Sequence, residues 1–185
     1  MKRFLSGAAV LGALTVAGGA AAQVEVATPI SLEARGGIAV PSGDFADFAD
    51  NAFGFGGSVH LQVAPRVSVY GGYSQTEFDM EPLGAEGTDR GWEAGARVAF
   101  PGVGFSPWVR GGLLFHDFET EVAGVEFDGD DEVGFEVGVG AAFPLGPRVS
   151  VSPGVAYRRY ATEFVGGGEL DVSYVVLDIG LRMRL

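Results

Sequence analysis

Apolar and polar residues alternate along most of the chain from residue 31 onward. In residues 133–143, for example, one parity holds Val, Phe and Ala, whereas the other holds mostly Gly and Glu. A period of two is that of a β-strand, and no long stretch keeps the three-to-four-residue spacing of a helix. The pattern predicts eight strands, at about 31–40, 53–63, 67–78, 90–100, 108–118, 133–143, 149–160 and 172–185.

The connectors between these strands are of two alternating kinds. Short, proline-bearing connectors cover 64–66, 101–107 and 144–147, and longer, acidic ones cover 41–52, 79–89, 119–132 and 161–171. Strict short–long alternation is typical of an up-and-down antiparallel meander. Pairing of the last strand with the first would close the sheet and remove its edges, so we expect an all-β, eight-stranded antiparallel up-and-down barrel.

One parity of the predicted strands carries nearly all of their charge. The interior of an eight-stranded barrel is only wide enough for its own side chains, so the bulky apolar parity cannot all point inward. If the apolar residues point outward, the outer surface of the barrel is compatible with lipid. A lipid-facing charged side chain at the bilayer midplane would cost about 2–4 kcal/mol. We therefore predict a transmembrane barrel rather than a soluble one. The predicted interior polar network comprises Glu33, Arg35, His60, Glu93, Arg97, Arg110, His116, Glu136, Arg158, Asp178, Arg182 and Arg184.

Charges inside such a barrel persist only when they are paired and hydrogen-bonded. We expect the acids to bridge four arginines across the lumen; the expected acids are Glu33, Glu93, Glu136 and Asp178, and the arginines are Arg35, Arg97, Arg110 and Arg182. Such pairs could gate a narrow ion path, or they could form a polar plug that fixes strand register. The plug is favoured because eight strands leave almost no lumen.

Aromatic residues lie beside the short connectors. Phe100 and Phe143 precede the turn prolines and Trp108 follows one, which is where an aromatic girdle belongs in a membrane barrel. Trp108 and Leu114, however, share the inward parity of the strand 108–118. A bulge in this strand is expected to resolve the conflict.

The first 22 residues have the pattern of a secretory signal peptide. Lys2 and Arg3 precede a short apolar stretch and a run of small residues that ends at Ala22. Residues 23–185 would then form a single barrel domain with 10 arginines against 24 acidic residues, a net charge of −14. So acidic a chain is a poor partner for nucleic acid, and the absence of cysteine excludes disulfides.

The last residues carry a specific pattern, Asp178-x-Gly180-x-x-Met183-x-Leu185. It resembles the C-terminal assembly signal of the small eight-stranded outer-membrane barrels, the group of the OmpA transmembrane domain, OmpX, Ail and the opacity-type proteins. Leu185 departs from the terminal Phe that is commoner there. The resemblance implies an integral outer-membrane protein that contacts lipid and lipopolysaccharide. It also implies recognition by the barrel-assembly machinery, with periplasmic chaperones on the way.

The two histidines are the first candidates for catalysis. Some barrels of this kind act on lipid A through a Ser-His pair and an acid on the lipid face, and His60 lies two residues after Ser58. Both have inward parity here, and His116 has no serine two residues away. We therefore predict interior, hydrogen-bonded histidines, no enzyme and no cofactor, with a lipid A-modifying enzyme as the alternative.

The long connectors and their margins hold 19 of the 24 acidic residues. The densest run, 128–132, lacks the ligand spacing of an EF-hand loop, so loose cation binding is secondary to a solvated acidic surface. The expected function is structural or surface-interactive, with acidic loops presented to a ligand, a host surface or a cation.

Overall fold

The computed structural model of the protein describes residues 29–80, 85–122, 125–128, 132–164 and 168–185. The predicted signal peptide, 1–22, and the centre of the acidic run 128–132 lie outside these residues. Within the described ranges no helix is long and apolar enough to cross a membrane.

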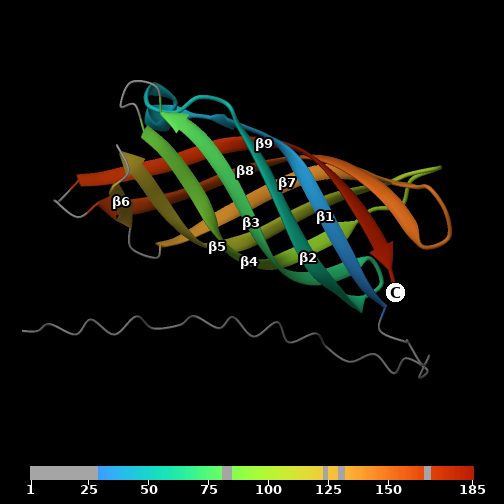
Figure 1. The fold of residues 1–185 in the computed structure, drawn as a ribbon. Coiled ribbons are helices and arrows are strands. Elements are labelled where there is room, and N and C mark those ends of the chain that lie inside the picture. Colours follow the sequence, from blue (N-terminus) through green and yellow to red (C-terminus); the bar gives the residue numbers. More distant parts are fainter. Residues whose placement is uncertain (1–28, 81–84, 123–124, 129–131, 165–167) are drawn as a thin grey trace, which may run out of the picture.

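The protein is a closed antiparallel barrel of eight long strands (Figure 1). Its elements are β1 (Ile30–Pro41), the 3-10 helix η1 (Gly43–Asp47), β2 (Ala52–Ala64), β3 (Val67–Met80), β4 (Ala85–Ala99), β5 (Ser106–Val122), β6 (Val125–Asp128), β7 (Glu132–Pro144), β8 (Val149–Phe164) and β9 (Gly168–Arg184). Among the described residues the short β6 pairs only with the end of β5 and takes no part in the closure.

Closure is made by the first and last strands. β1 pairs antiparallel with β9 from Ser31 opposite Arg184 to Pro41 opposite Tyr174. All other long strands pair with their neighbours in the chain, and β4 with β5 joins the two halves. The predicted up-and-down topology is confirmed, and each long strand pairs with a neighbour on both sides.

The strands extend further into the predicted acidic connectors than the sequence indicated. β3 and β4 continue to Met80 and Ala85, where a connector was expected from 79 to 89. Alternation persists there, because Met80 and Ala85 are buried while Asp79 and Glu86 are exposed. Beyond the bilayer the outward parity meets water, so acidic residues can occupy it without ending the strand.

The apolar parity faces outward. Val137 and Leu181 are 52% and 53% exposed, whereas Arg97 is 3% exposed. This confirms the predicted orientation, in which the apolar face of the sheet contacts lipid and the charged face lines the lumen.

Two predictions about β5 are wrong. Trp108 is 2% exposed and Leu114 is fully buried, so both point into the lumen and Trp108 is not part of a girdle. The register of β5 with β4 and β7 is continuous, so the strand contains no bulge. The lumen accepts the Trp108 ring because Gly140 and Gly154 on neighbouring strands leave room for it. The register shifts instead in β2, between Gln62 and Ala64.

An apolar layer fills the barrel at the end where η1 lies. Phe45 of η1 packs edge-on against Phe78 and Phe118, with ring centroids 5.1 and 5.8 Å apart. Phe78 also packs against Tyr174 at 5.4 Å. Burying each of these side chains stabilises the fold by about 1.5–3 kcal/mol. The chain segment after β1 therefore folds back into the barrel, although the sequence suggested an open acidic loop.

Candidate functional site

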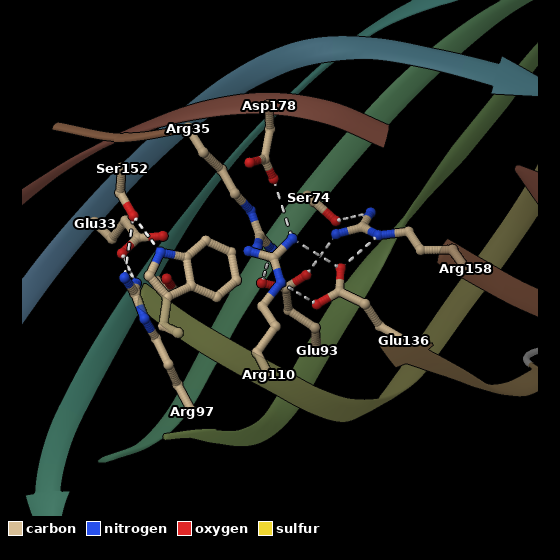
Figure 2. A network of polar contacts seen from close by, with 12 residues as sticks. Glu33, Arg35, Ser74, Glu93, Arg97, Arg110, Glu136, Ser152, Arg158 and Asp178 are labelled. Atoms are coloured by element: carbon tan, nitrogen blue, oxygen red, sulfur yellow. Dashed lines mark hydrogen bonds and ion pairs between the residues drawn. The ribbon is translucent and has the colours of Figure 1, made fainter. Parts of the chain in front are cut away.

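A layer of eight charged side chains crosses the lumen (Figure 2). It contains four arginines and four carboxylates contributed by six strands: Glu33, Arg35, Glu93, Arg97, Arg110, Glu136, Arg158 and Asp178. All eight are buried. Their positions follow from the inward parity of each strand, and glycines of the same parity give the long arginines room to reach across.

Arg158 on β8 is the hub of one half of the layer. Its Nε donates to Glu136 Oε2 at 2.8 Å and its Nη2 donates to Glu93 Oε2 at 2.9 Å. Its Nη1 donates to the hydroxyl of Ser74 at 3.0 Å. Arg35 pairs with the other oxygen of Glu93. Each acceptor therefore comes from a strand other than the one that carries the arginine.

Arg110 on β5 joins this half to β9. Its Nε lies 2.8 Å from Glu136 Oε1, and its Nη2 donates to Asp178 Oδ2 at 3.0 Å. The phenol of Tyr70 donates to Glu136 Oε1 at 3.3 Å. Glu136 thus accepts from three side chains, which makes it the most connected acid of the layer.

Arg97 on β4 forms the lower part of the layer. Its Nη1 donates to Glu33 Oε2 at 2.9 Å, and its Nη2 donates to Ser152 Oγ at 3.0 Å. The indole Nε1 of Trp108 also donates to Ser152 Oγ at 3.0 Å. The guanidinium carbon of Arg97 lies 4.3 Å from the centre of the Trp108 ring, a cation–π distance.

The layer is electrically balanced, with four positive and four negative side chains. Removing charges from water is costly, and only mutual pairing with further hydrogen bonds offsets that cost. One of the four expected arginines is wrong: Arg158, not Arg182, completes the set. Arg182 is only half-buried, and Arg184 is exposed, because both lie near the end of β9, below the layer. Neither forms an ion pair within the described part of the chain.

His60 lies in the lumen but is not arranged for nucleophilic catalysis. The Ser58 hydroxyl is 3.0 Å from His60 Nε2, and Glu33 Oε2 is 3.7 Å from the same nitrogen. A catalytic triad needs the serine and the acid on opposite ring nitrogens. His60 Nδ1 has no hydrogen-bond partner among the described residues.

His116 belongs to a separate buried group beside the apolar layer. Its Nδ1 is 2.6 Å from Asp89 Oδ1, and the hydroxyl of Tyr174 donates to Asp89 Oδ2. Asp89 was assigned to a connector in the sequence, and its role was missed. Asp89 lies four residues before the inward-facing Glu93. Extending the strand alternation back to it would therefore have placed its side chain inside the barrel. The described residues contain no cluster of three or more His, Cys, Asp or Glu side chains that could hold a metal ion.

Trp108 occupies a recess formed by two glycines. A Cβ at Gly140 would lie 2.3 Å from the indole, and one at Gly154 would lie 2.7 Å from it. We expect Gly140→Ala to lower the free energy of unfolding by about 1–3 kcal/mol, because the ring must leave its place over Arg97. Urea titration of the folded barrel measures the loss, and red-shifted Trp108 emission in a Trp92→Phe background reports the movement.

Gly146→Ala is the matched control for this substitution. A Cβ at Gly146 has no heavy atom within 4 Å, so its stability and emission should equal those of the wild type. Equal behaviour of the two variants would contradict the packing of Trp108 against Gly140.

A closed eight-stranded antiparallel barrel with an apolar outer wall and a charged lumen defines an integral protein of the bacterial outer membrane. The chain belongs to the family of the outer membrane protein beta-barrel domain, whose sequence model matches residues 6–184. A search of curated proteins found no match.

Three solved structures illustrate the shared fold. Neisserial surface protein A is similar over 84% of this chain and 97% of its own, with 15% identity and a TM-score of 0.73. The N-terminal barrel domain of Pseudomonas aeruginosa OprF is similar over 85% and 98%, with 15% identity and a TM-score of 0.57. OprG of the same organism is similar over 85% and 97%, with 14% identity and a TM-score of 0.56. At these identities the likeness concerns the fold alone.

Proposed function

We propose that the protein is a non-enzymatic outer-membrane barrel that acts through its structure and its outer surface. The observation that carries this proposal is the filling of the lumen by two successive layers. The apolar layer around Phe45 lies above the balanced layer of arginines and carboxylates. An ion that passed through the lumen would have to displace the apolar layer and then the charged layer. The charged layer offers such an ion no unpaired charge.

The test is conductance in planar bilayers. The refolded wild-type protein is expected to give no unitary conductance above background, and Phe45→Ala alone should remain silent because the charged layer still closes the lumen. A porin added to the same bilayer is the positive control. Steps in the wild type that change with Arg97→Ala or Glu93→Ala would overturn the proposal in favour of the narrow ion path.

The absence of enzymatic activity is supported by the placement of Ser58 and His60 inside the lumen, away from lipid. The lipid A alternative requires that expression of the protein changes the acyl chains of lipid A. Mass spectra of lipid A with and without expression should be identical.

We propose that the acidic outer surface is the part of the molecule that binds partners. Exposed acids of the described residues surround the end where η1 lies; they include Asp44, Asp47, Glu77, Asp79, Glu86 and Asp171. This negative charge fits a ligand, a host surface or cations shared with lipopolysaccharide phosphates.

At the other end of the barrel we propose that the barrel-assembly machinery recognises Asp178, Gly180, Met183 and Leu185. Met183 and Leu185 are exposed on the apolar face, and Gly180 lies against Glu33.

A further inference from the structure

A cavity of about 370 Å³ opens at the short-turn end of the barrel. This end faces the periplasm in outer-membrane barrels. Five arginines line the cavity: Arg66, Arg97, Arg148, Arg182 and Arg184. Its other polar lining residues are Gln62 and the serines Ser31, Ser68, Ser106 and Ser150, and no Asp or Glu is among the lining residues. We refer to this space as the basic vestibule.

The charge of the basic vestibule is not neutralised by the described protein. Residues 23–185 carry 10 arginines against 24 acids, yet half of those arginines meet here. Only Arg97 is paired, with Glu33 of the balanced layer. Arg66, Arg148, Arg182 and Arg184 form no ion pair within the described residues. Like charges held together at one mouth destabilise each other unless an anion joins them.

Arg66 is held in a conformation that disfavours an arginine. It occupies the second central position of the two-residue turn between β2 and β3, with a φ of 71°. Pro at the first position and a positive φ at the second define a type II turn, for which Gly is the usual residue. In a chain with 31 glycines, an arginine at this position indicates a use for its side chain.

Arg97 closes the inner end of the vestibule. It is 3% exposed, and its Nε has no hydrogen-bond partner among the described residues, although its two terminal nitrogens are satisfied. A buried donor without a partner is unfavourable, and an acceptor entering the cavity would relieve it.

We propose that the basic vestibule binds phosphate groups. Guanidinium groups form paired, charge-assisted hydrogen bonds to phosphate oxygens, and serine hydroxyls complete the donor set. The cavity, at about 370 Å³, is large enough to admit a phosphate group. The phosphate could belong to a phospholipid headgroup of the periplasmic leaflet or to a soluble periplasmic compound. This inference is independent of the proposed closed lumen.

Calorimetric titration of the refolded protein with inorganic pyrophosphate, in zwitterionic detergent at low ionic strength, is the test. We expect saturable binding by the wild type. The double variant Arg148→Gln/Arg182→Gln should bind at least about tenfold more weakly, since each charge-assisted hydrogen bond contributes about that factor. Arg90→Gln/Arg159→Gln is the matched control: it removes the same charge from arginines that pair with Glu119 and Asp171 on the barrel wall. Absence of saturable binding, or equal weakening in both double variants, would overturn the proposal.

Arg66→Gly separates binding from folding. Glycine suits the positive φ, so the urea midpoint should equal or exceed that of the wild type. Pyrophosphate affinity should nevertheless fall by about tenfold, because one charge-assisted donor is lost at the mouth of the cavity. Wild-type affinity in this variant would show that Arg66 does not bind phosphate and that its positive φ serves no binding role.

Native mass spectrometry distinguishes the two sources of phosphate. Protein is refolded in micelles containing equal amounts of phosphatidylglycerol and phosphatidylcholine. Preferential retention of phosphatidylglycerol by the wild type, lost in Arg148→Gln/Arg182→Gln and displaced by pyrophosphate, identifies a lipid headgroup. Pyrophosphate binding without lipid preference identifies a soluble compound. The absence of both would refute the site.

Discussion

Replacing Glu136 by alanine is expected to lower the free energy of unfolding by about 3–5 kcal/mol. Glu136 is 1% exposed and accepts hydrogen bonds from Arg110, Arg158 and Tyr70. Its removal leaves the central layer with an excess positive charge in a medium of low dielectric constant. Urea titration in lipid vesicles, followed by the mobility difference between unboiled and boiled samples, measures the change.

Glu86→Ala is the control for this prediction. Glu86 lies on β4 with its side chain exposed at the outer end of the barrel, so its loss should change stability by no more than about 0.5 kcal/mol. If Glu136→Ala were as mild as Glu86→Ala, the layer would not depend on charge balance.

Placing an arginine at Val137 is expected to destabilise the folded barrel by about 2–4 kcal/mol. Val137 lies near the middle of β7, on the outward face and 52% exposed. On a water-facing wall the same change would be nearly neutral, but here the guanidinium would enter hydrocarbon. Equilibrium folding into vesicles of defined lipid measures the cost.

Leu145→Arg provides the comparison at a different depth. Leu145 is in the short connector after β7 and is 67% exposed, so an arginine there reaches the interface and should cost about 0–1 kcal/mol. Similar values for the two variants would mean that the outer face of β7 does not contact lipid.

The sequence identified the interior set more reliably than the partners within it. Arg97 and Arg110 are opposite each other in the β4–β5 register, so strand adjacency alone suggests repulsion. In the folded barrel each reaches an acid on another strand, Glu33 and Glu136 respectively. Arg182 lies opposite Glu33 in the β1–β9 register, yet Glu33 is taken by Arg97 from across the lumen. These pairs depend on the position of each residue along the barrel axis. That position is set by the tilt and stagger of the strands, and no local sequence pattern encodes it.

The outer end shows a second kind of difference. Acidic runs such as 79–89 were interpreted as connectors because charge usually marks solvated loops. The strands continue into them, and the inward aromatic residue Phe78, just before one such run, packs against Phe45 of η1. That packing brings together segments far apart in the chain, so the apolar layer could not be recognised from one strand at a time.

What the sequence determined by itself is the number of membrane strands, their antiparallel order, their closure and the face that each presents to lipid. These follow from a strand period of two and from the requirement that every backbone group in a bilayer be paired. Only the tertiary structure decided which arginine meets which acid, where Trp108 points and which five arginines meet at the short-turn end. Those outcomes depend on how far each strand is shifted against its neighbours around the ring, because that shift sets which side chains share a level inside it.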